Sequence, residues 1–208
     1  MLPTSSYTNP TLKQGDLLEC PFEQLKQWQS AYPNERDANA AILATVSKDL
    51  QPSTRTVLIK DITKENGLLF FTNYQSNKAK DLEYNAKVSL TFYWRDTPRQ
   101  CNLKGVARKV EAPISKAYFR QRPYESQLSS YTSFQSQPID SRESLEKMLE
   151  KNHDKFSKEK QIPCPEFWGG YWIEPFSFEF WSGRQYRFHD RFLYEKKEKN
   201  WLISRIQP

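Results

Sequence analysis

Two cations, Arg55 and Lys60, bracket a short apolar run and could each bind an anion. The run is rich in β-branched residues and follows Pro52, so it is typical of a β-strand. Strand residues alternate between two faces, which would put Arg55 and Lys60 on opposite sides of the strand. Arginine suits bidentate contact with a phosphate group, and lysine acts as a point charge. Two solvated strand ends would give the same pattern.

A second cluster begins at Phe71 and Thr72, where an apolar run ends and the sequence Ser76-Asn77-Lys78 follows. The pattern indicates a strand, a polar turn and a short helix. A helix N-terminus attracts anions, and Lys78 in its first turn would add positive charge. A helix that is simply capped by Ser76 or Asn77 is the plainer explanation.

A phenol, a guanidinium and a hydroxyl form the third cluster. Tyr118 and Arg122 are four residues apart, so they share a face if the segment is helical. Ser126 follows a break at Pro123. The three groups could converge on one phosphate, and a basic helix end stabilised by the helix dipole would look the same.

The fourth cluster, near the C-terminus, holds Arg187, His189 and Arg191. If Arg187 begins a strand, all three side chains point to one face. Three potentially cationic groups on one face are costly unless an anion compensates them. A solvated face would also explain the pattern, and a single histidine is more often structural than catalytic.

Several common kinds of site are absent from the sequence. The six glycines form neither a dinucleotide-binding nor a P-loop motif, so a bound phosphate must be held mainly by side chains. With two histidines and no C-x-x-C pair, we expect no metal site, and the three cysteines should be reduced thiols. No apolar run approaches the roughly 20 residues of a membrane span. Because a secretory signal is also missing, we expect a cytoplasmic protein.

The periodicity predicts one α+β domain, residues 21–208, behind a flexible N-terminal arm, residues 1–20. Helices are expected at 21–32, 77–85, 113–121 and 141–156, and a polar loop at 127–138. Strands are expected at 40–46, 54–60, 68–72, 88–94, 100–110, 170–173, 177–181, 188–194 and 201–206. Most linkers are too short for crossover helices, so the sheet should be a small antiparallel barrel with surrounding helices.

From residue 37 to the C-terminus the chain resembles the pyridoxine/pyridoxamine 5'-phosphate oxidase family. The resemblance rests on RTVLIK at 55–60, FTN at 71–73, Ser76 and Lys78, Arg99-Gln100, YFRQRPYESQ at 118–127, Gln135-Ser136, FWGG at 167–170, EFW at 179–181 and RFHDR at 187–191. Each motif is weak by itself, and their order and spacing together are specific.

The resemblance implies an FMN-binding split β-barrel that forms a homodimer, with two flavin sites at the subunit interface. FMN would contact Arg55, Thr56, Val57, Leu58, Ile59, Lys60, Phe71, Thr72, Asn77, Lys78, Gln100, Gln135, Ser136, Trp181 and Arg191. The substrate phosphate would be bound by Lys60, Tyr118, Arg122 and Ser126. Arg187 and His189 would lie over the pyridine ring, and Asp37 would be an accessory group near the reacting carbon.

The implied reaction is the FMN-dependent oxidation of pyridoxine 5'-phosphate and pyridoxamine 5'-phosphate to pyridoxal 5'-phosphate. A hydride passes from substrate C4' to flavin N5, and dioxygen is reduced to hydrogen peroxide. The chain departs from the family at Asn77, where arginine is common, and at Ser182, where glutamine is usual. Residues 128–131 read Leu-Ser-Ser-Tyr in place of a glycine and small apolar residues.

Two other functions fit parts of the pattern. A related split barrel could be a flavin reductase or a flavin-binding module without this turnover, but such a protein does not need both the third and the fourth cluster. A net charge of +6 with many aromatics could suit single-stranded nucleic acid. Because 25 acidic residues are mixed among 31 basic ones, we expect neither a nucleic-acid nor a membrane partner.

Overall fold

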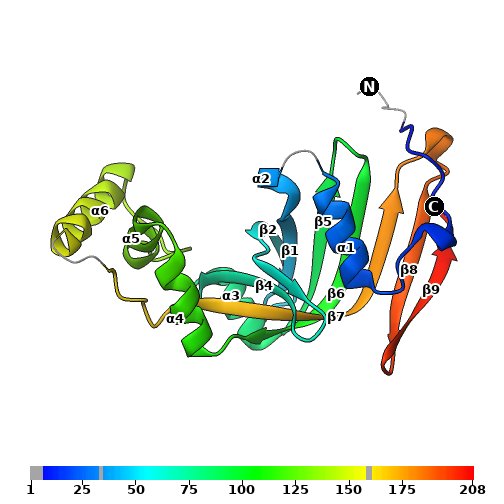
Figure 1. Ribbon diagram of the computed structural model, residues 1–208. Coiled ribbons are helices and arrows are strands. Elements are labelled where there is room, and N and C mark those ends of the chain that lie inside the picture. Colours follow the sequence, from blue (N-terminus) through cyan, green and yellow to red (C-terminus); the bar gives the residue numbers. More distant parts are fainter. Residues whose placement is uncertain (1–6, 33–34, 158–160) are drawn as a thin grey trace.

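A computed structural model describes residues 7–32, 35–157 and 161–208. Figure 1 shows a curled sheet, with helices α4–α6 extending from one end and the β8–β9 hairpin standing at the other. The strands are β1 (Ala40–Val46), β2 (Pro52–Leu58), β3 (Asp61–Thr63), β4 (Gly67–Asn73), β5 (Lys87–Trp94), β6 (Arg99–Lys109), β7 (Trp168–Ser182), β8 (Asp190–Lys197) and β9 (Asn200–Ile206). The helices are α1 (Pro21–Ser30), α2 (Glu35–Ala38), α3 (Asn77–Tyr84), α4 (Ala112–Gln121), α5 (Tyr124–Thr132) and α6 (Arg142–Phe156), with short 3-10 helices η1 (Gln14–Asp16) and η2 (Gln185–Arg187).

The strands pair antiparallel in the order β2-β1-β5-β6-β7-β4-β3, and β8 pairs with both β7 and β9. The α+β class and the antiparallel sheet predicted from the short linkers are therefore confirmed. The two strands expected at 170–173 and 177–181 are one continuous strand, β7, and this expectation was wrong. Pro175 is accommodated because the register with β6 shifts between Lys104 and Gly105, where a bulge leaves room for a residue without an N–H.

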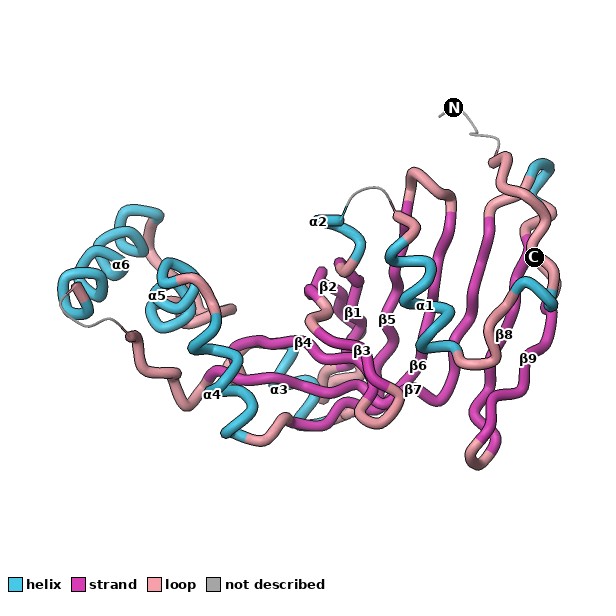
Figure 2. The backbone as a smooth tube through the Cα atoms, viewed as in Figure 1, coloured by secondary structure: helices cyan, strands magenta, loops and turns pink. Residues whose placement is uncertain are grey.

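Helix α1 lies against the curled sheet, as Figure 2 shows, and its apolar side chains belong to the main core. Leu25 is fully buried, and the Trp28 ring meets Trp94 of β5 and Phe180 of β7 edge to face. The apolar side chains whose three- and four-residue spacing predicted this helix form one stripe, and that stripe faces the core. A second, smaller core lies at the start of β7, where Phe119 of α4 and Phe156 of α6 join Trp168.

The polar loop expected at 127–138 is wrong for its first half, because residues 124–132 form helix α5. Serine and threonine have low helix propensity, so the segment carries little local signal. The helix is stabilised by packing: Leu128 is buried in the smaller core, with Tyr124 and Tyr131 beside it. Those three positions have helical spacing, so tertiary contacts outweigh the local preference.

Residues 7–20 lie along the C-terminal half of the sheet. Asn9 donates to the carbonyl oxygens of Thr97 and Pro98, and the backbone N–H of Leu12 donates to Asp190. Residues 1–6 lie outside the described part, and the flexibility of the arm stays a prediction. No helix in the described part of the chain combines the length and the apolar character that a membrane span needs.

Candidate functional site

A polar cleft of about 530 Å³ lies between β2 and β4 of the sheet and helices α4 and α5. It brings together side chains from the first three predicted clusters. Of the predicted residues, Thr56, Val57, Leu58, Lys60, Phe71, Thr72, Lys78, Tyr118, Arg122, Ser126 and Gln135 line it. Segments that extend from Thr56 to Trp168 in the sequence thus meet in one cavity.

Lys78 is buried near one end of the cleft and is held by neutral groups alone. Its Nζ donates to Thr72 Oγ1 at 3.2 Å, Ser76 Oγ at 3.3 Å and Gln135 Oε1 at 2.9 Å. Burial, and then the charge of Arg55, lower the pKa of Lys78 to about 8. No carboxylate of the described residues pairs with Lys78. A buried ammonium without a counter-ion favours an anionic ligand at this position.

Arg55 lies beside this end of the cleft and is fixed by hydrogen bonds. It donates to the Leu43 carbonyl oxygen at 3.2 Å, Thr45 Oγ1 at 2.7 Å and Ser53 Oγ at 2.6 Å. Asp81 Oδ2 is 3.8 Å from its Nη2. Burial lowers the pKa of Arg55, and the Asp81 carboxylate opposes that shift. The guanidinium is therefore only partly compensated.

Two further predicted residues lie at the start of α3. The backbone N–H of Asn77 donates to Ser136 Oγ at 3.3 Å. Ser136 has a φ of 70°, a left-handed conformation that turns the chain towards α3. Ile59, between the cleft residues Leu58 and Lys60, is buried in the main core. Asn77, Ser136 and Ile59 therefore do not line the cleft themselves.

The other end of the cleft is built from stacked rings and a guanidinium. Phe71 stacks on Tyr118 with ring centroids 4.1 Å apart and on Trp168 with centroids 5.1 Å apart. The Arg122 guanidinium lies 4.9 Å above the Trp168 ring, and burial lowers its pKa. In the described chain no carboxylate forms an ion pair with Arg122. This end is also suited to an anion.

Five further predicted residues lie at the far end of β7, and not at the cleft. Trp168 begins β7 and lines the cleft, and Trp181 lies one residue before the end of β7, so the strand between them extends roughly 40 Å. Figure 1 shows helices α4–α6 and the β8–β9 hairpin at opposite ends of the sheet. We call this distant set, Gln100, Trp181, Arg187, His189 and Arg191, the distal group. One chain thus holds the predicted site as two separate halves.

Ring contacts and one hydrogen bond arrange the distal group. The ring centroids of Trp181 and His189 are 4.7 Å apart, and Tyr7 approaches both rings edge-on. The backbone N–H of Arg184 donates to His189 Nδ1 at 3.0 Å. Burial and the charge of Arg187 lower the pKa of His189, which favours the neutral ring. Because Nδ1 accepts a hydrogen bond, the proton of the neutral ring is on Nε2.

Arg187 does not begin a strand, and the strand expected at 188–194 starts two residues later than predicted. Arg187 ends η2 with a φ of 64°, and β8 starts only at Asp190. The turn is closed by the His189 bond to Arg184 and by an ion pair between Arg184 and Asp190 at 3.8 Å, and the Asp190 carboxylate also accepts from the backbone N–H of Leu12. Arg187, His189 and Arg191 therefore do not follow one another along a single strand.

Arg191 is compensated, so it needs no ligand to balance its charge. Its Nη2 is 2.8 Å from the Glu179 carboxylate across the β7–β8 pair. Asp37, the proposed accessory group, is in α2 and does not line the cleft. Among the described residues, no group of three His, Cys, Asp or Glu could hold a metal ion.

Sequence reasoning missed part of the cleft wall. Asn73, Pro123, Ser129, Ser130, Ser133 and Trp168 also line it. Ser126, Ser129, Ser130 and Ser133 have the i, i+3, i+4, i+7 spacing of one helix face. That spacing would have been informative if residues 124–132 had been expected to be helical.

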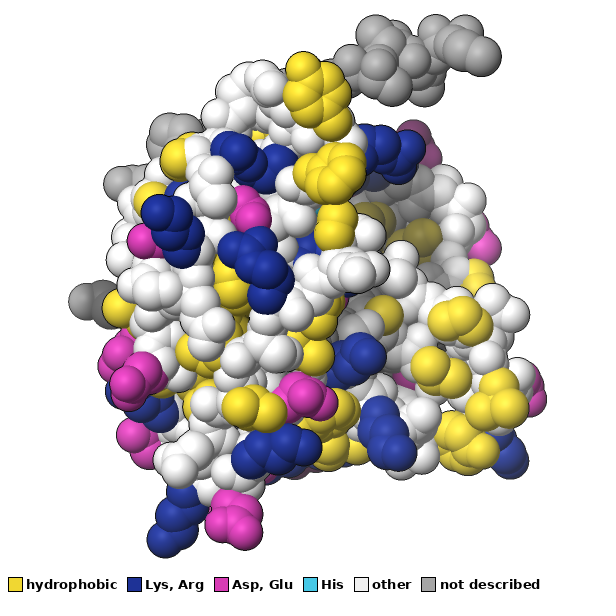
Figure 3. Space-filling model, turned by 90° about the vertical axis from the view of Figure 1, so that its right-hand side faces the viewer, with side chains coloured by type: hydrophobic (Ala, Val, Ile, Leu, Met, Phe, Trp, Pro, Cys, Tyr) yellow, Lys and Arg dark blue, Asp and Glu magenta, His cyan; other side chains and the backbone are white. Residues whose placement is uncertain are grey.

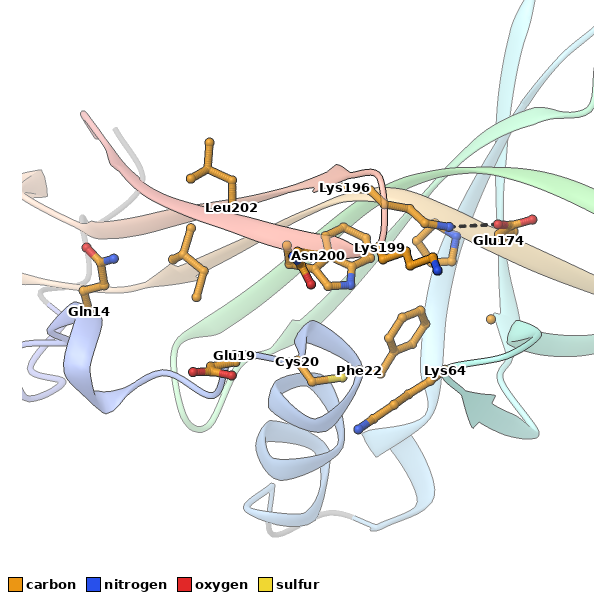
Figure 4. A pocket seen from close by; sticks show the side chains of 14 residues that line it. Gln14, Glu19, Cys20, Phe22, Lys64, Glu174, Lys196, Lys199, Asn200 and Leu202 are labelled. Atoms are coloured by element: carbon orange, nitrogen blue, oxygen red, sulfur yellow. Dashed lines mark hydrogen bonds and ion pairs between the residues drawn. The ribbon is translucent and has the colours of Figure 1, made fainter.

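A second cavity, of about 670 Å³, lies between α1, the β3–β4 turn and the β8–β9 hairpin (Figure 4). Two of its three lysines, Lys64 and Lys196, form ion pairs with Glu23 and Glu174. None of the predicted site residues lines this cavity. Figure 3 shows the face at the β8–β9 end of the molecule, where basic side chains are separated by acidic and hydrophobic ones. That face is not a continuous basic stripe of the kind nucleic acids require.

Comparison with known proteins adds independent information. A family model described as pyridoxamine 5'-phosphate oxidase matches residues 30–155. A model described as the pyridoxine 5'-phosphate oxidase C-terminal dimerisation region matches residues 168–208. The chain is 41% identical over 206 residues to the pyridoxine/pyridoxamine 5'-phosphate oxidase of Deinococcus deserti, covering 98% of this chain and 96% of the relative. It is 45% identical to that of Teredinibacter turnerae, covering 95% and 93%.

Two solved structures have the same fold. PhzG from Burkholderia lata, in complex with tetrahydrophenazine-1-carboxylic acid, superposes with a TM-score of 0.87 at 27% identity, covering 97% of this chain and all of that one. An FMN-binding protein from Nostoc punctiforme that is related to pyridoxamine 5'-phosphate oxidases superposes with a TM-score of 0.73 at 16% identity, covering 92% and 100%. The predicted split barrel with surrounding helices is confirmed.

Proposed function

The chain belongs to the pyridoxamine 5'-phosphate oxidase family, and on that premise we propose that it oxidises pyridoxine 5'-phosphate and pyridoxamine 5'-phosphate to pyridoxal 5'-phosphate. The alcohol and dioxygen give the aldehyde and hydrogen peroxide. The amine, dioxygen and water give the aldehyde, ammonia and hydrogen peroxide. The observation that carries the proposal is a single cleft with one uncompensated cation, Lys78, near one end and another, Arg122, at the other. Such a cleft suits two phosphate-bearing molecules bound together.

The residues present fit FMN. Lys78, with Arg55 beside it and the Ser136 hydroxyl at the start of α3, would hold the FMN phosphate by side chains. The β2 residues 56–58 and the Phe71 side chain line the cleft and would contact the rest of the cofactor. Bound FMN supplies the redox chemistry, because it accepts two electrons from the substrate and passes them to dioxygen.

The chain itself binds and orients the substrate. Arg122, Tyr118, Ser126 and Lys60 at the other end of the cleft would bind its phosphate. Arg187 would hold the pyridine ring in register, and His189, neutral at pH 7, would donate a hydrogen bond from Nε2 to a ring substituent. Fixing the reacting carbon in this way is the protein's main contribution to the rate.

A homodimer would complete each site. The cleft and the distal group lie too far apart in one chain to contact the same small molecule, so each site would take its cleft from one subunit and its distal group from the other. The match of residues 168–208 to a dimerisation region supports this arrangement. Exposed apolar side chains support it too: Leu58 and Ile42 on the β1–β2 pair are 46% exposed, and Phe188 beside the distal group is 78% exposed.

An oxidase that acts on an unphosphorylated substrate is the second candidate, because PhzG, which was solved with tetrahydrophenazine-1-carboxylic acid, shares the fold at 27% identity. The phosphate end of the cleft distinguishes the two. An oxidase of an unphosphorylated substrate has no need for the unpaired Arg122 together with Tyr118 and Ser126.

An anaerobic experiment tests the proposal. The FMN-loaded protein is mixed with pyridoxine 5'-phosphate without oxygen, and the visible absorbance of the flavin is followed. We expect bleaching that reverses when air is admitted, together with formation of pyridoxal 5'-phosphate. A bound flavin that remains oxidised with both the alcohol and the amine substrate would refute the function and leave the fold assignment intact.

FMN affinity should fall as the pH rises through the pKa of Lys78. In the folded chain this pKa is lowered to about 8, so the ammonium loses its proton above pH 8. The FMN phosphate is a dianion throughout this range and favours the charged lysine. From pH 7 to pH 9 we expect the FMN dissociation constant to rise about tenfold, as measured by quenching of flavin fluorescence.

Two variants complete this test. Lys78→Ala should bind FMN weakly at both pH values and lose the pH dependence. Lys80→Ala, which removes an exposed lysine of the same helix, should behave like the unchanged protein. If the FMN dissociation constant of Lys78→Ala still rises with pH, another group causes the pH dependence.

A further inference from the structure

We infer that Ser130 is a further residue of the phosphate-binding end of the cleft, which positions Arg122 and itself donates a hydrogen bond to the substrate phosphate. The inference rests on the proposed function and extends it to a segment at which the chain departs from its family, since residues 128–131 read Leu-Ser-Ser-Tyr where a glycine and small apolar residues are usual. It depends on three observations: the bond between Ser130 and Arg122, the environment of Arg122, and the direction of the α5 serines.

The first observation is a single hydrogen bond. Arg122 Nη1 donates to Ser130 Oγ at 2.8 Å, and both side chains are partly buried. The guanidinium is also stacked on Trp168, and the Arg122 carbonyl oxygen accepts from Gln127 Nε2 at 2.8 Å. The stacking fixes the plane of the guanidinium, and the bond to Ser130 fixes its rotation within that plane. A guanidinium held in one orientation loses less entropy when it binds a phosphate.

The second observation concerns the hydroxyl proton of Ser130. A hydroxyl that accepts from Arg122 still has its own proton to donate. Within the described part of the chain, the Ser130 hydroxyl has no other hydrogen-bond partner. Ser130 lines the cleft together with Arg122, Tyr118 and Ser126. Its proton is therefore available to an anion that binds between these residues.

The third observation is the helix face on which Ser130 lies. Ser126, Ser129 and Ser130 follow one face of α5, and all three line the cleft. Ser157, at the end of α6, is exposed and does not line the cleft. It is therefore the control serine, because its substitution by alanine removes a hydroxyl outside the proposed site.

The test compares three variants of the full-length, FMN-loaded protein. Dissociation constants are measured for pyridoxal 5'-phosphate and for unphosphorylated pyridoxal, and kcat and KM for pyridoxine 5'-phosphate. Ser130→Ala should weaken binding of the phosphorylated ligand about tenfold and raise KM by a similar factor with little change in kcat, because the lost bond is to a charged group. Binding of pyridoxal should not change. Ser130→Thr, which keeps the hydroxyl, and Ser157→Ala should both stay within about twofold of the unchanged protein.

The outcomes separate this inference from the proposed function. If the unchanged protein prefers the phosphorylated ligand and Ser130→Ala keeps that preference, the inference is overturned and the function stands. If Ser130→Ala weakens binding of pyridoxal and pyridoxal 5'-phosphate equally, Ser130 has only a structural role and the inference is overturned. If the unchanged protein does not distinguish the two ligands, the proposed function fails, and the inference fails with it.

Discussion

Arg187→Ala should retain FMN and lose at least about a hundredfold in kcat/KM, because misplacing a substrate by about 1 Å can have an effect of this size. Arg187 is exposed on a tight turn, and the cleft that would bind the cofactor phosphate lies at the other end of β7. The substitution removes no buried contact, so the fold and the FMN dissociation constant should be unchanged. Stopped-flow measurement of anaerobic flavin reduction, together with a fluorescence titration of FMN, checks both statements.

Arg108→Ala is the control for this prediction. Arg108 is an exposed arginine of β6 that bonds to Asn66 and lies outside both halves of the proposed site. In the Arg108→Ala variant, the flavin should be reduced at the normal rate. If Arg187→Ala also reduces flavin at the normal rate, Arg187 has no part in the site. If Arg187→Ala loses both catalytic activity and FMN, Arg187 holds the cofactor and does not orient the substrate.

Arg122→Ala and Arg187→Ala chains, each nearly inactive alone, should recover activity when they are mixed. In a hybrid dimer one site takes both of its halves from unmodified regions, and the other site carries both substitutions. Random mixing places half of all chains in hybrids, so about a quarter of the normal activity should return. Hybrids can be isolated with two different affinity tags, and their activity should then be about half of normal.

Mixing Arg122→Ala with Lys60→Ala chains provides the contrasting case. Both substitutions lie in the same half of the site, the cleft. Every site in the hybrid then contains one damaged cleft, so activity should not return. Recovery in this mixture, or no recovery in purified Arg122→Ala and Arg187→Ala hybrids, would contradict a site that is shared between subunits.

Local patterns predicted most of the helices and strands, because the spacing of apolar residues within each segment is enough to indicate its secondary structure. The apolar spacing at 21–32 became α1, and the apolar run at 40–46 became β1 with the same bounds. The helix expected at 77–85 is α3, with Ser76 as its N-cap residue. The three-residue strand β3 was missed, because so short a segment carries too little periodicity to be recognised.

The sequence by itself determined the chemical inventory of the proposed site and the class of the fold. It shows which cations, hydroxyls and rings the chain offers and that no Gly-rich loop can bind a phosphate, and its short linkers require an antiparallel sheet. The family also follows from the order and spacing of the motifs, which the comparisons confirm. All of these features depend on neighbouring residues or on the composition of the chain.

Only the tertiary structure decided how those groups are combined. Arg191 is compensated by Glu179 across a strand pair, and the turn at Arg187 is closed by Asp190, which bonds to Leu12, 178 residues away. Helix α5 forms because Leu128 packs against distant side chains, and that packing directs its serines into the cleft. The long strand β7 separates the two halves of the proposed site. These outcomes depend on contacts between residues far apart in the chain, which local periodicity does not encode.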